Sequence, residues 1–376
     1  MKKKKILIDI NSIVPLFVKG YFSGIGRTTL ELINAFSAIK EEIPFEIILY
    51  SQNMKGIGGR NLNLPFKNKH FYLPHRENYN KLLGKFPIIE IFTRYDLFHI
   101  PHNFDWLAKP EKTLLTIHDT LFFACPDSFL GHDFARKCYP KLAQKCKGIV
   151  TCSHSSKHDI VKFMGVPEEK ITVIHWGVSA KIFYPEKQDN ILNTNQKHNL
   201  VHPYFIMVSC SIGRKNTELL MENFRNYTQK GGKYDLVLIW KNPPQELIQK
   251  YAEEIENQRI RFIGGVSQDE LRTFYSGATA SFFPSKYEGF GLPILESMAC
   301  GTPVVTCHNS SLEEVGGNTA FYVSSESEHE MADFMHDFEI GKYDLEDLKQ
   351  KALHHVKNFT WEKTVREYIA FYSKYL

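Results

Sequence analysis

The stretch KYEGFGLPILESMACGTPVV, residues 286–305, places two glutamates, Glu288 and Glu296, on either side of a glycine-rich turn. The apolar run ATASFF just before it is typical of a buried strand. Pro293 suits the first turn of a helix, where its missing N–H costs nothing, and Gly301 suits the helix end. The stretch therefore predicts a strand, a turn and a helix whose N-terminus can bind a phosphate through free N–H groups and the helix dipole.

The two carboxylates flank this predicted phosphate site. We expect Glu296 in the first helical turn and Glu288 in the preceding loop. A carboxylate does not bind phosphate, but it accepts hydrogen bonds from hydroxyl groups such as those of a ribose or a sugar ring. The pair therefore indicates a nucleotide joined to a sugar. The glutamates alone leave open an alternative, in which Glu296 caps the helix and Glu288 is a solvated loop residue.

The whole chain alternates short apolar, β-branched runs with segments of helical periodicity, from ILIDI near the N-terminus to AFYV near the C-terminus. This alternation predicts parallel sheets that are buried on both faces. The polar stretch EKQDNILNTNQKHN has few large apolar residues and predicts a linker. We therefore predict an α/β fold of two Rossmann-like domains facing a cleft. The expected segments are an N-terminal domain at 1–185, a linker at 186–200, a second domain at 201–355 and a terminal helix at 356–376.

Composition narrows the possible partners. Residues 1–180 hold 25 Lys+Arg and 16 Asp+Glu, a balance of +9, and the remainder holds 46 − 25 = 21 basic and 42 − 16 = 26 acidic residues, or −5. The basic half would suit an anionic lipid surface or an anionic acceptor, although scattered solvated lysines are the alternative. Seven cysteines without CxxC spacing favour a reduced, cytoplasmic compartment. No nucleic-acid partner is expected.

Two cations follow the apolar run YFIMVS, in the sequence SCSIGRKNTELL. Arg214 provides a planar fork and Lys215 a point charge, a combination that suits a diphosphate. They would also neutralise a departing nucleoside diphosphate. On its own, an Arg-Lys pair is more often surface charge.

Three further motifs lie in the N-terminal half. In GYFSGIGRTTLELI, Gly24 and Gly26 permit a close backbone approach or positive φ, and Thr28 with Glu31 predicts a capping box that opens a helix. A tight turn is the simpler explanation of these glycines. TIHDT ends a predicted strand with His118 and Asp119, and DLFHIPHN ends another with His99 and His102. TCSHSSKHDI predicts a helix capped by Ser153.

EGFGLPILESMACGTPVV closely resembles the signature of retaining glycosyltransferases of family 4, also called group 1. The similarity continues in RIRFIGGVSQDELRTFYSGATASFFPS and SSLEEVGGNTAFYV, and it covers nearly the whole chain. It implies the GT-B architecture of two Rossmann-like domains, with the C-terminal helix crossing back to the N-terminal domain. It further implies that Glu296 binds ribose hydroxyls, that Glu288 lies at the donor sugar, and that backbone amides of Phe290, Gly291 and Leu292 contact the sugar and diphosphate.

The resemblance also assigns roles outside the signature. It implies that Arg214 and Lys215 form the donor-phosphate loop and that His118 is the main catalytic residue of the N-terminal domain. It places Gly24 and Gly26 beside the diphosphate. The element Cys125-Pro126-Asp127 matches a family motif near the donor sugar. The acceptor side would be lined by Arg27, Asp119 and His102, with His99 as an alternative to His102.

The reaction implied is transfer of a hexosyl unit from a nucleotide diphosphate sugar to a hydroxyl, with retention at the anomeric carbon. No D-x-D follows a strand, and Arg214, Lys215 and the helix N-terminus can supply the charge a metal would bring, so we expect no metal and no cofactor. TIHDT, RKN and SSLEEVGG look most like mannosyltransferases of bacterial surface-polysaccharide assembly, which suggests GDP-mannose and a glycan or lipid-linked acceptor. The alternatives are a UDP-sugar-dependent transferase, an epimerase or phosphorylase of the same fold, and a non-catalytic nucleotide-binding scaffold.

Overall fold

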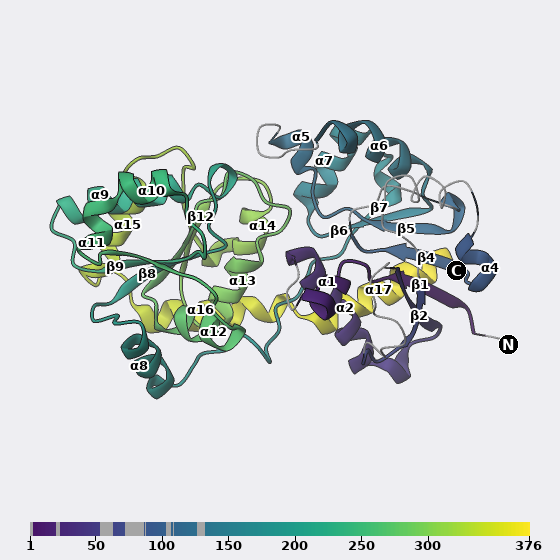
Figure 1. Cartoon of the computed structure of the whole chain (residues 1–376), viewed down its shortest axis with the longest axis horizontal. Coiled ribbons are helices and arrows are strands. Elements are labelled where there is room, and N and C mark those ends of the chain that lie inside the picture. The colour runs from purple at the N-terminus through teal and green to yellow at the C-terminus, as the bar shows by residue number, and fades with distance from the viewer. Residues whose placement is uncertain are drawn as a thin grey trace. The chain divides into compact units, whose positions relative to one another are not determined.

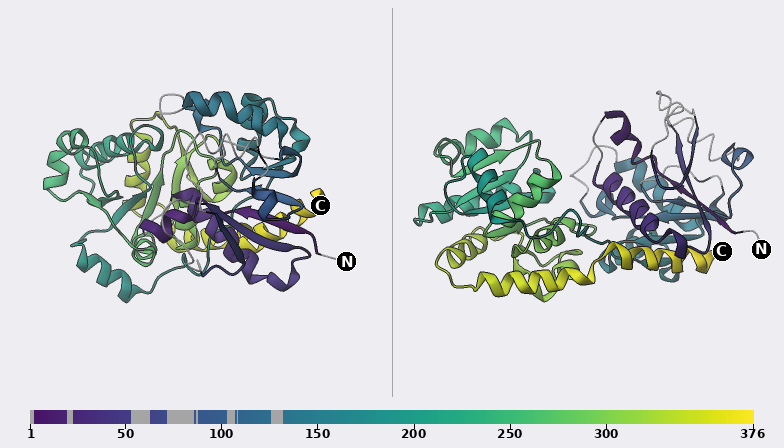
Figure 2. Two further views of the ribbon diagram at one scale, coloured as in Figure 1. Left: turned by 45° about the vertical axis from the view of Figure 1, so that its right-hand side comes forward. Right: turned by 90° about the horizontal axis from the view of Figure 1, so that it is seen from below.

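The computed structural model describes residues 3–19, 23–52, 63–71, 86, 88–102, 107, 109–125 and 132–376. The chain forms two compact units, unit 1 (Met1–Gly177 with Trp361–Leu376) and unit 2 (Val178–Thr360) (Figure 1, Figure 2). Each unit is built around one parallel sheet with helices on both faces, as the alternating pattern predicted. Among the described residues, no helix is both long and apolar enough to span a bilayer.

The sheet of unit 1 has seven parallel strands in the order β3-β2-β1-β4-β5-β6-β7. The strands are β1 (Lys5–Asp9), β2 (Glu46–Gln52), β3 (Lys67–Phe71), β4 (Leu97–Ile100), β5 (Thr113–Thr116), β6 (Gly148–Thr151) and β7 (Ile171–Val173). The helices are α1 (Val14–Lys19), α2 (Gly24–Ala38), α4 (Ile88–Phe92), α5 (Leu121–Ala124), α6 (His132–Lys145), α7 (His154–Met164) and α17 (Trp361–Tyr375). Most of these strands are short and apolar because they are buried on both faces, whereas the edge strand β3 is polar and only partly buried.

The C-terminal helix α17 belongs to unit 1, which confirms the expectation that it returns to the N-terminal domain. It packs beside α2, where the rings of Phe36 and Tyr372 stack with centroids 5.9 Å apart. The Tyr372 hydroxyl lies 2.6 Å from Nδ1 of the fully buried His99, whose Nε2 lies 2.8 Å from Thr116 Oγ1. These contacts anchor the end of the chain to the centre of the sheet. His99 is therefore a core residue, and the suggestion that it lines the acceptor side is wrong.

Unit 2 has six parallel strands in the order β10-β9-β8-β11-β12-β13. They are β8 (Tyr204–Val208), β9 (Asp235–Ile239), β10 (Ile260–Ile263), β11 (Ala280–Phe283), β12 (Val304–Cys307) and β13 (Phe321–Val323). The helices are α8 (Gln188–Lys197), α9 (Thr217–Gln229), α10 (Gln245–Lys250), α11 (Ala252–Glu256), α12 (Gln268–Gly277), α13 (Leu292–Ala299), α14 (Leu312–Gly316), α15 (Glu330–Glu339) and α16 (Leu345–His355). β8 and β11 are neighbours near the middle of this sheet, so the loops that follow them meet at its carboxyl edge.

The polar stretch expected as a linker is largely the helix α8, which packs against α12. Glu186 fixes its start, because its carboxylate accepts from Lys187 N and pairs with Arg272 at 2.8 Å. The remainder of α8 is held by one buried apolar side chain, Ile191, and by the ion pair between Lys197 and Glu270. The two units divide at residues 177/178 and 360/361, whereas the sequence predicted boundaries around 186–200 and at 356. The predicted linker was misjudged because polar contacts hold α8, although its sequence shows little apolar periodicity.

Candidate active site

The turn between β11 and α13 has the conformation that its glycine and proline predict. Gly291, the N-cap of α13, has φ 109°, and a Cβ there would lie 3.1 Å from Leu312 Cδ2. Pro293 lies in the first helical turn, and Gly301, with φ 82°, follows the helix end. Glu296 is in the second turn, so its expected place in the first turn is wrong. The backbone N–H of Ile294, one of those expected to be free, donates to the carbonyl of Gly291 at 3.0 Å.

Two serines from the segment before α14 hold this turn. The Ser311 hydroxyl lies 3.0 Å from the carbonyl oxygen of Glu288 and 2.8 Å from that of Phe290, so it can share its proton between them. The backbone N–H of Glu288 donates to Ser310 Oγ at 3.0 Å. The loop is thus fixed from a neighbouring strand connection, which explains why SSLEEVGG accompanies the glutamate signature.

Arg214, Lys215 and Glu288 form one cluster in unit 2, which we call the charged cluster. Arg214 Nη1 and Lys215 Nζ each lie 2.7 Å from Glu288 Oε1, and the Glu288 residue is 9% exposed. Arg214 also donates to the carbonyl of Tyr287 at 2.8 Å, and Lys215 Nζ lies 4.7 Å from the centre of the Phe283 ring. The structure therefore brings together the loops after β8 and β11.

The electrostatics of the charged cluster are coupled. Burial raises the pKa of Glu288, but the charges of Lys215 and Arg214 outweigh it and hold that pKa below its usual range. Burial lowers the pKa of Lys215, and Glu288 offsets part of this effect. Two cations against one carboxylate leave the cluster with an excess positive charge when Lys215 is protonated. That excess is suited to an anion with more than one charge, such as a diphosphate.

Glu296 and the turn before α13 form the rest of the candidate site in unit 2. Glu296 is 4% exposed, and its Oε2 lies 3.5 Å from the hydroxyl of Tyr275, on α12. Phe290 is buried, and its carbonyl oxygen accepts from the Ser311 hydroxyl. Glu288, Phe290, Gly291, Leu292 and Glu296 all belong to one turn and the helix that it opens.

In unit 1, His118 follows β5 and lies beside the end of β4. Its Nε2 lies 3.1 Å from the carbonyl oxygen of Pro101, and because a carbonyl only accepts, the proton is on Nε2. Nδ1 is then an acceptor, and it is buried without a hydrogen-bond partner among the described residues. The ring packs 5.1 Å from that of Trp176. His118 therefore carries one unused acceptor.

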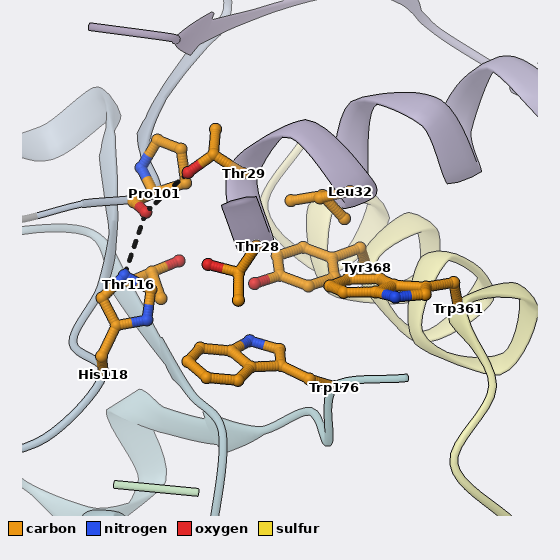
Figure 3. A pocket seen from close by; sticks show the side chains of 9 residues that line it. All are labelled: Thr28, Thr29, Leu32, Pro101, Thr116, His118, Trp176, Trp361 and Tyr368. Carbon is orange, nitrogen blue, oxygen red and sulfur yellow. Dashed lines mark hydrogen bonds between the residues drawn. The ribbon is translucent and has the colours of Figure 1, made fainter. Parts of the chain in front are cut away.

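A small cavity of about 10 Å³ adjoins His118 (Figure 3). Thr28 and Thr29 of α2 and Tyr368 of α17 line it, together with Trp176. In Figure 3 the unpartnered nitrogen of His118 faces this interior, while the other nitrogen is hydrogen-bonded to Pro101. The space is close to the minimum that one water molecule needs.

Burial lowers the pKa of His118 to about 4, and the carbonyl of Pro101 offsets part of that effect. Burial likewise lowers the pKa of His99 to about 3. Both imidazoles are thus neutral at physiological pH in the folded protein. A neutral His118 can accept a hydrogen bond from a sugar hydroxyl but cannot act as a cationic electrophile.

The pKa of His118 makes stability depend on pH. In the unfolded chain this histidine titrates near pH 6.5, so the unfolded state binds an extra proton between about pH 6.5 and 4 and is favoured there. Going from about pH 7 to about pH 5 should remove about 2 kcal/mol of folding free energy through this one group. His118→Gln, which keeps a donor for Pro101, should reduce the loss measured by urea unfolding by that amount. A loss as large in the variant as in the wild type would contradict the assigned neutral state.

The start of α2 differs from the prediction. The helix begins at Gly24 with Ser23 as N-cap, whose side chain accepts from Gly26 N at 3.2 Å. Gly24 and Gly26 are therefore helical, and the positive φ allowed for them is wrong. Thr28 lies inside the helix and donates to the carbonyl of Ile25, so the Thr28–Glu31 capping box is also wrong. Ser23, a residue type preferred at N-caps, directly before Gly24 was the sequence signal for the true cap.

The remaining predicted acceptor-side residues lie in unit 1. Asp119 accepts from Leu121 N at 3.0 Å at the start of α5, and His102 Nε2 lies 2.9 Å from Oδ1 of the buried Asp9. Arg27 is half-buried in α2. Ser153 caps α7 as predicted, accepting from Ser156 N. Pro126 and Asp127 of the predicted Cys125-Pro126-Asp127 element lie outside the described residues.

The comparisons with known proteins match both units. The profile of glycosyl transferases group 1 matches residues 190–355, and that of glycosyltransferase family 4 matches residues 22–181. The chain belongs to glycosyltransferase family 4, group 1. It is 29% identical over 250 residues to the O-antigen chain mannosyltransferase RfbU of Salmonella typhimurium, covering 63% of this chain and 67% of that protein. It is 27% identical over 284 residues to O-antigen chain mannosyltransferase B of Escherichia coli, covering 73% and 72%.

Solved structures show the same fold. A glycosyltransferase from Rickettsia africae matches with a TM-score of 0.76 at 18% identity, covering 100% of this chain and 99% of that one. Anabaena Alr3699/HepE, in complex with UDP and glucose, matches with a TM-score of 0.72 at 14% identity, covering 99% and 100%. The two parallel-sheet units are thus the Rossmann-like domains of the GT-B architecture, and this family 4 chain is a glycosyltransferase.

Proposed function

We propose that this glycosyltransferase moves a mannosyl unit from GDP-mannose to a hydroxyl of a glycan or lipid-linked acceptor, with retention at the anomeric carbon and without a metal. The observation that carries the proposal is the charged cluster beside the N-terminus of α13. Arg214, Lys215 and the positive end of the α13 dipole supply positive potential where a diphosphate must be held and released. Glu288 offers carboxylate oxygens for sugar hydroxyls in the same place.

Each residue of the site has a separate role in this proposal. Lys215 and Arg214 stabilise the negative charge that grows on the leaving nucleoside diphosphate. Glu296 receives the ribose hydroxyls, and the Gly291–Leu292 backbone holds the phosphates and sugar. His118, neutral and with a free Nδ1, accepts a hydrogen bond from the donor sugar and orients its anomeric carbon. Gly24 and Gly26 belong to the donor site in this proposal, and Arg27, Asp119 and His102 belong to the acceptor side.

Retention without a covalent intermediate fits these assignments. A double displacement requires a carboxylate free to attack the anomeric carbon. Glu288 is instead held by two cations at 2.7 Å, which favours a positioning role over attack. The same-face route, in which the leaving phosphate accepts the proton of the incoming hydroxyl, needs only the cations and the oriented sugar.

The choice of mannose and of a surface glycan rests on the relatives. RfbU and O-antigen chain mannosyltransferase B are named for mannosyl transfer into O-antigen chains. HepE is solved with UDP and glucose, which keeps a UDP-sugar donor as the second candidate. An O-antigen-like acceptor places the reaction in the cytoplasm, at the inner face of the membrane, and the basic N-terminal half would suit that surface.

A calorimetric panel in EDTA tests the proposal. It compares GDP, UDP, GDP-mannose, UDP-glucose, UDP-GlcNAc and UDP-galactose, and we expect GDP and GDP-mannose alone to bind. Selective UDP-glucose binding would replace the donor, and binding that appears only with manganese would overturn metal independence. Turnover of a bound sugar into an isomer without acceptor would favour an epimerase. Donor binding with no transfer to any acceptor would favour a scaffold.

A further inference from the structure

Unit 1 carries a cluster of exposed apolar side chains on and beside the short helix α4. Phe86 is 56% exposed, Ile91 72% and Phe92 60%. Twelve large hydrophobic residues are exposed among the described residues, and three of them fall within residues 86–92. Single exposed apolar residues are ordinary, but three within seven positions form a patch. We call these three residues the apolar patch.

Helix α4 holds the apolar patch firmly. On its inner side, Ile89 is 1% exposed and joins the core under β2 and β4. The Phe92 ring packs 5.9 Å from that of Phe71, at the end of the edge strand β3. Lys69 Nζ donates to the Phe92 carbonyl at 2.7 Å, which satisfies the end of the helix. The outward direction of Ile91 and Phe92 is therefore fixed by buried contacts on the other side. Figure 1 shows α4 at the outer rim of unit 1.

Three basic residues lie on the strand β3, which contacts α4, or just after that helix. Lys67 opens β3, Lys69 lies at the end of α4, and Arg94 follows the helix by two residues. Lys67 and Arg94 are exposed, and neither forms an ion pair with a described residue. The neighbouring Asp96 is neutralised, because its carboxylate pairs with Lys4 and accepts from Lys5 N. Exposed aromatic and branched aliphatic side chains, with exposed basic residues on the adjoining segments, are a combination that enters the interface of an anionic bilayer.

We propose that the apolar patch and its cations dock unit 1 on the surface of an anionic membrane. The proposal rests on the proposed function in one respect, that the acceptor is carried by a membrane. A bilayer fits better than a protein groove, because α4 has only five residues and displays two large side chains with no continuing apolar stripe. The excess of +9 over residues 1–180 adds attraction to anionic lipid at longer range. Docking of this kind is reversible.

Vesicle co-sedimentation tests the apolar part of the surface. The purified full chain should bind vesicles that contain phosphatidylglycerol and should bind phosphatidylcholine vesicles weakly. The double variant Ile91→Glu/Phe92→Glu should lose roughly tenfold or more of its partition, because two inserted side chains become anionic. The matched control is Val201→Glu/Ile340→Glu, which makes the same change at unit 2 residues exposed by 77% and 74%. It should bind vesicles like the wild type.

Lys67→Gln and Arg94→Gln test the electrostatic part. Each should weaken binding to the anionic vesicles roughly fivefold and leave binding to neutral vesicles unchanged. Thermal unfolding and calorimetric binding of GDP-mannose should be the same for all variants, which separates docking from folding and from the donor site. Wild-type protein that stays in the supernatant, or Ile91→Glu/Phe92→Glu protein that sediments like the wild type, overturns the proposal. Vesicle binding without any donor binding would support the docking surface and contradict the proposed function.

Discussion

Lys215→Met is expected to lower kcat/KM by roughly 100-fold or more, because it removes one of the two cations placed for the leaving diphosphate. Methionine keeps most of the volume beneath the ammonium and its contact with the Phe283 ring. Glu288 keeps Arg214 as a partner at 2.7 Å, so the carboxylate is not left unpaired. Affinity for the free nucleoside diphosphate should fall too, since loss of a charge-assisted contact costs about 1.5–3 kcal/mol. Kinetics and calorimetry on the same protein measure both effects.

Lys250→Met is the matched control for this substitution. Lys250 is also a lysine of unit 2 that pairs with a glutamate, Glu218 at 2.9 Å, and it also lies over an aromatic ring, that of Tyr251. It is on α10 and pairs with Glu218 and Glu222 rather than with Glu288, so its loss should change neither kinetics nor nucleotide affinity. Unchanged nucleoside diphosphate affinity in Lys215→Met would mean that the loop after β8 does not hold the phosphates.

The sequence was most informative where the backbone itself imposes a residue type. Gly291 and Pro293 define a turn that few other residues can form, and the helix they open begins where they predict. The parallel sheets were readable because strands buried on both faces must be short and apolar. The meeting of Arg214 and Lys215 with Glu288 followed from parallel topology, since loops after neighbouring strands share one edge of the sheet.

The features that sequence reasoning missed depend on tertiary contacts. Ser310 and Ser311 hold the Glu288 turn from another strand connection, and no local pattern reveals that hydrogen bond. In the sequence, His99 has the position of a ligand-binding residue at a strand end. In the structure, Tyr372 and Thr116 contact its two ring nitrogens. Helix α8 has too few apolar residues to show periodicity, because ion pairs at its two ends hold it in place.

Glu288→Gln should separate the two halves of the donor site. The carboxylate is the counter-ion of both Arg214 and Lys215 in the free protein, so a diphosphate must share these cations with it. The neutral amide releases them, and free nucleoside diphosphate should bind roughly tenfold more tightly, equivalent to about 1.4 kcal/mol. Transfer should nevertheless fall by roughly 100-fold or more, because the amide offers the sugar hydroxyls a weaker and differently shaped acceptor.

Tighter binding of the nucleoside diphosphate together with slower transfer is the test of the role assigned to Glu288, because simple loss of structure would weaken both binding and transfer. Glu254→Gln is the matched control: Glu254 is likewise 9% exposed and pairs with Arg225, but on α11. Both variants should lose stability, because Glu254→Gln leaves one cation and Glu288→Gln leaves two without the carboxylate partner. Only Glu288→Gln should alter the nucleoside diphosphate affinity. If that variant binds the diphosphate more weakly than the wild type, Glu288 serves to hold the cations in place, and the sugar must be recognised by other residues.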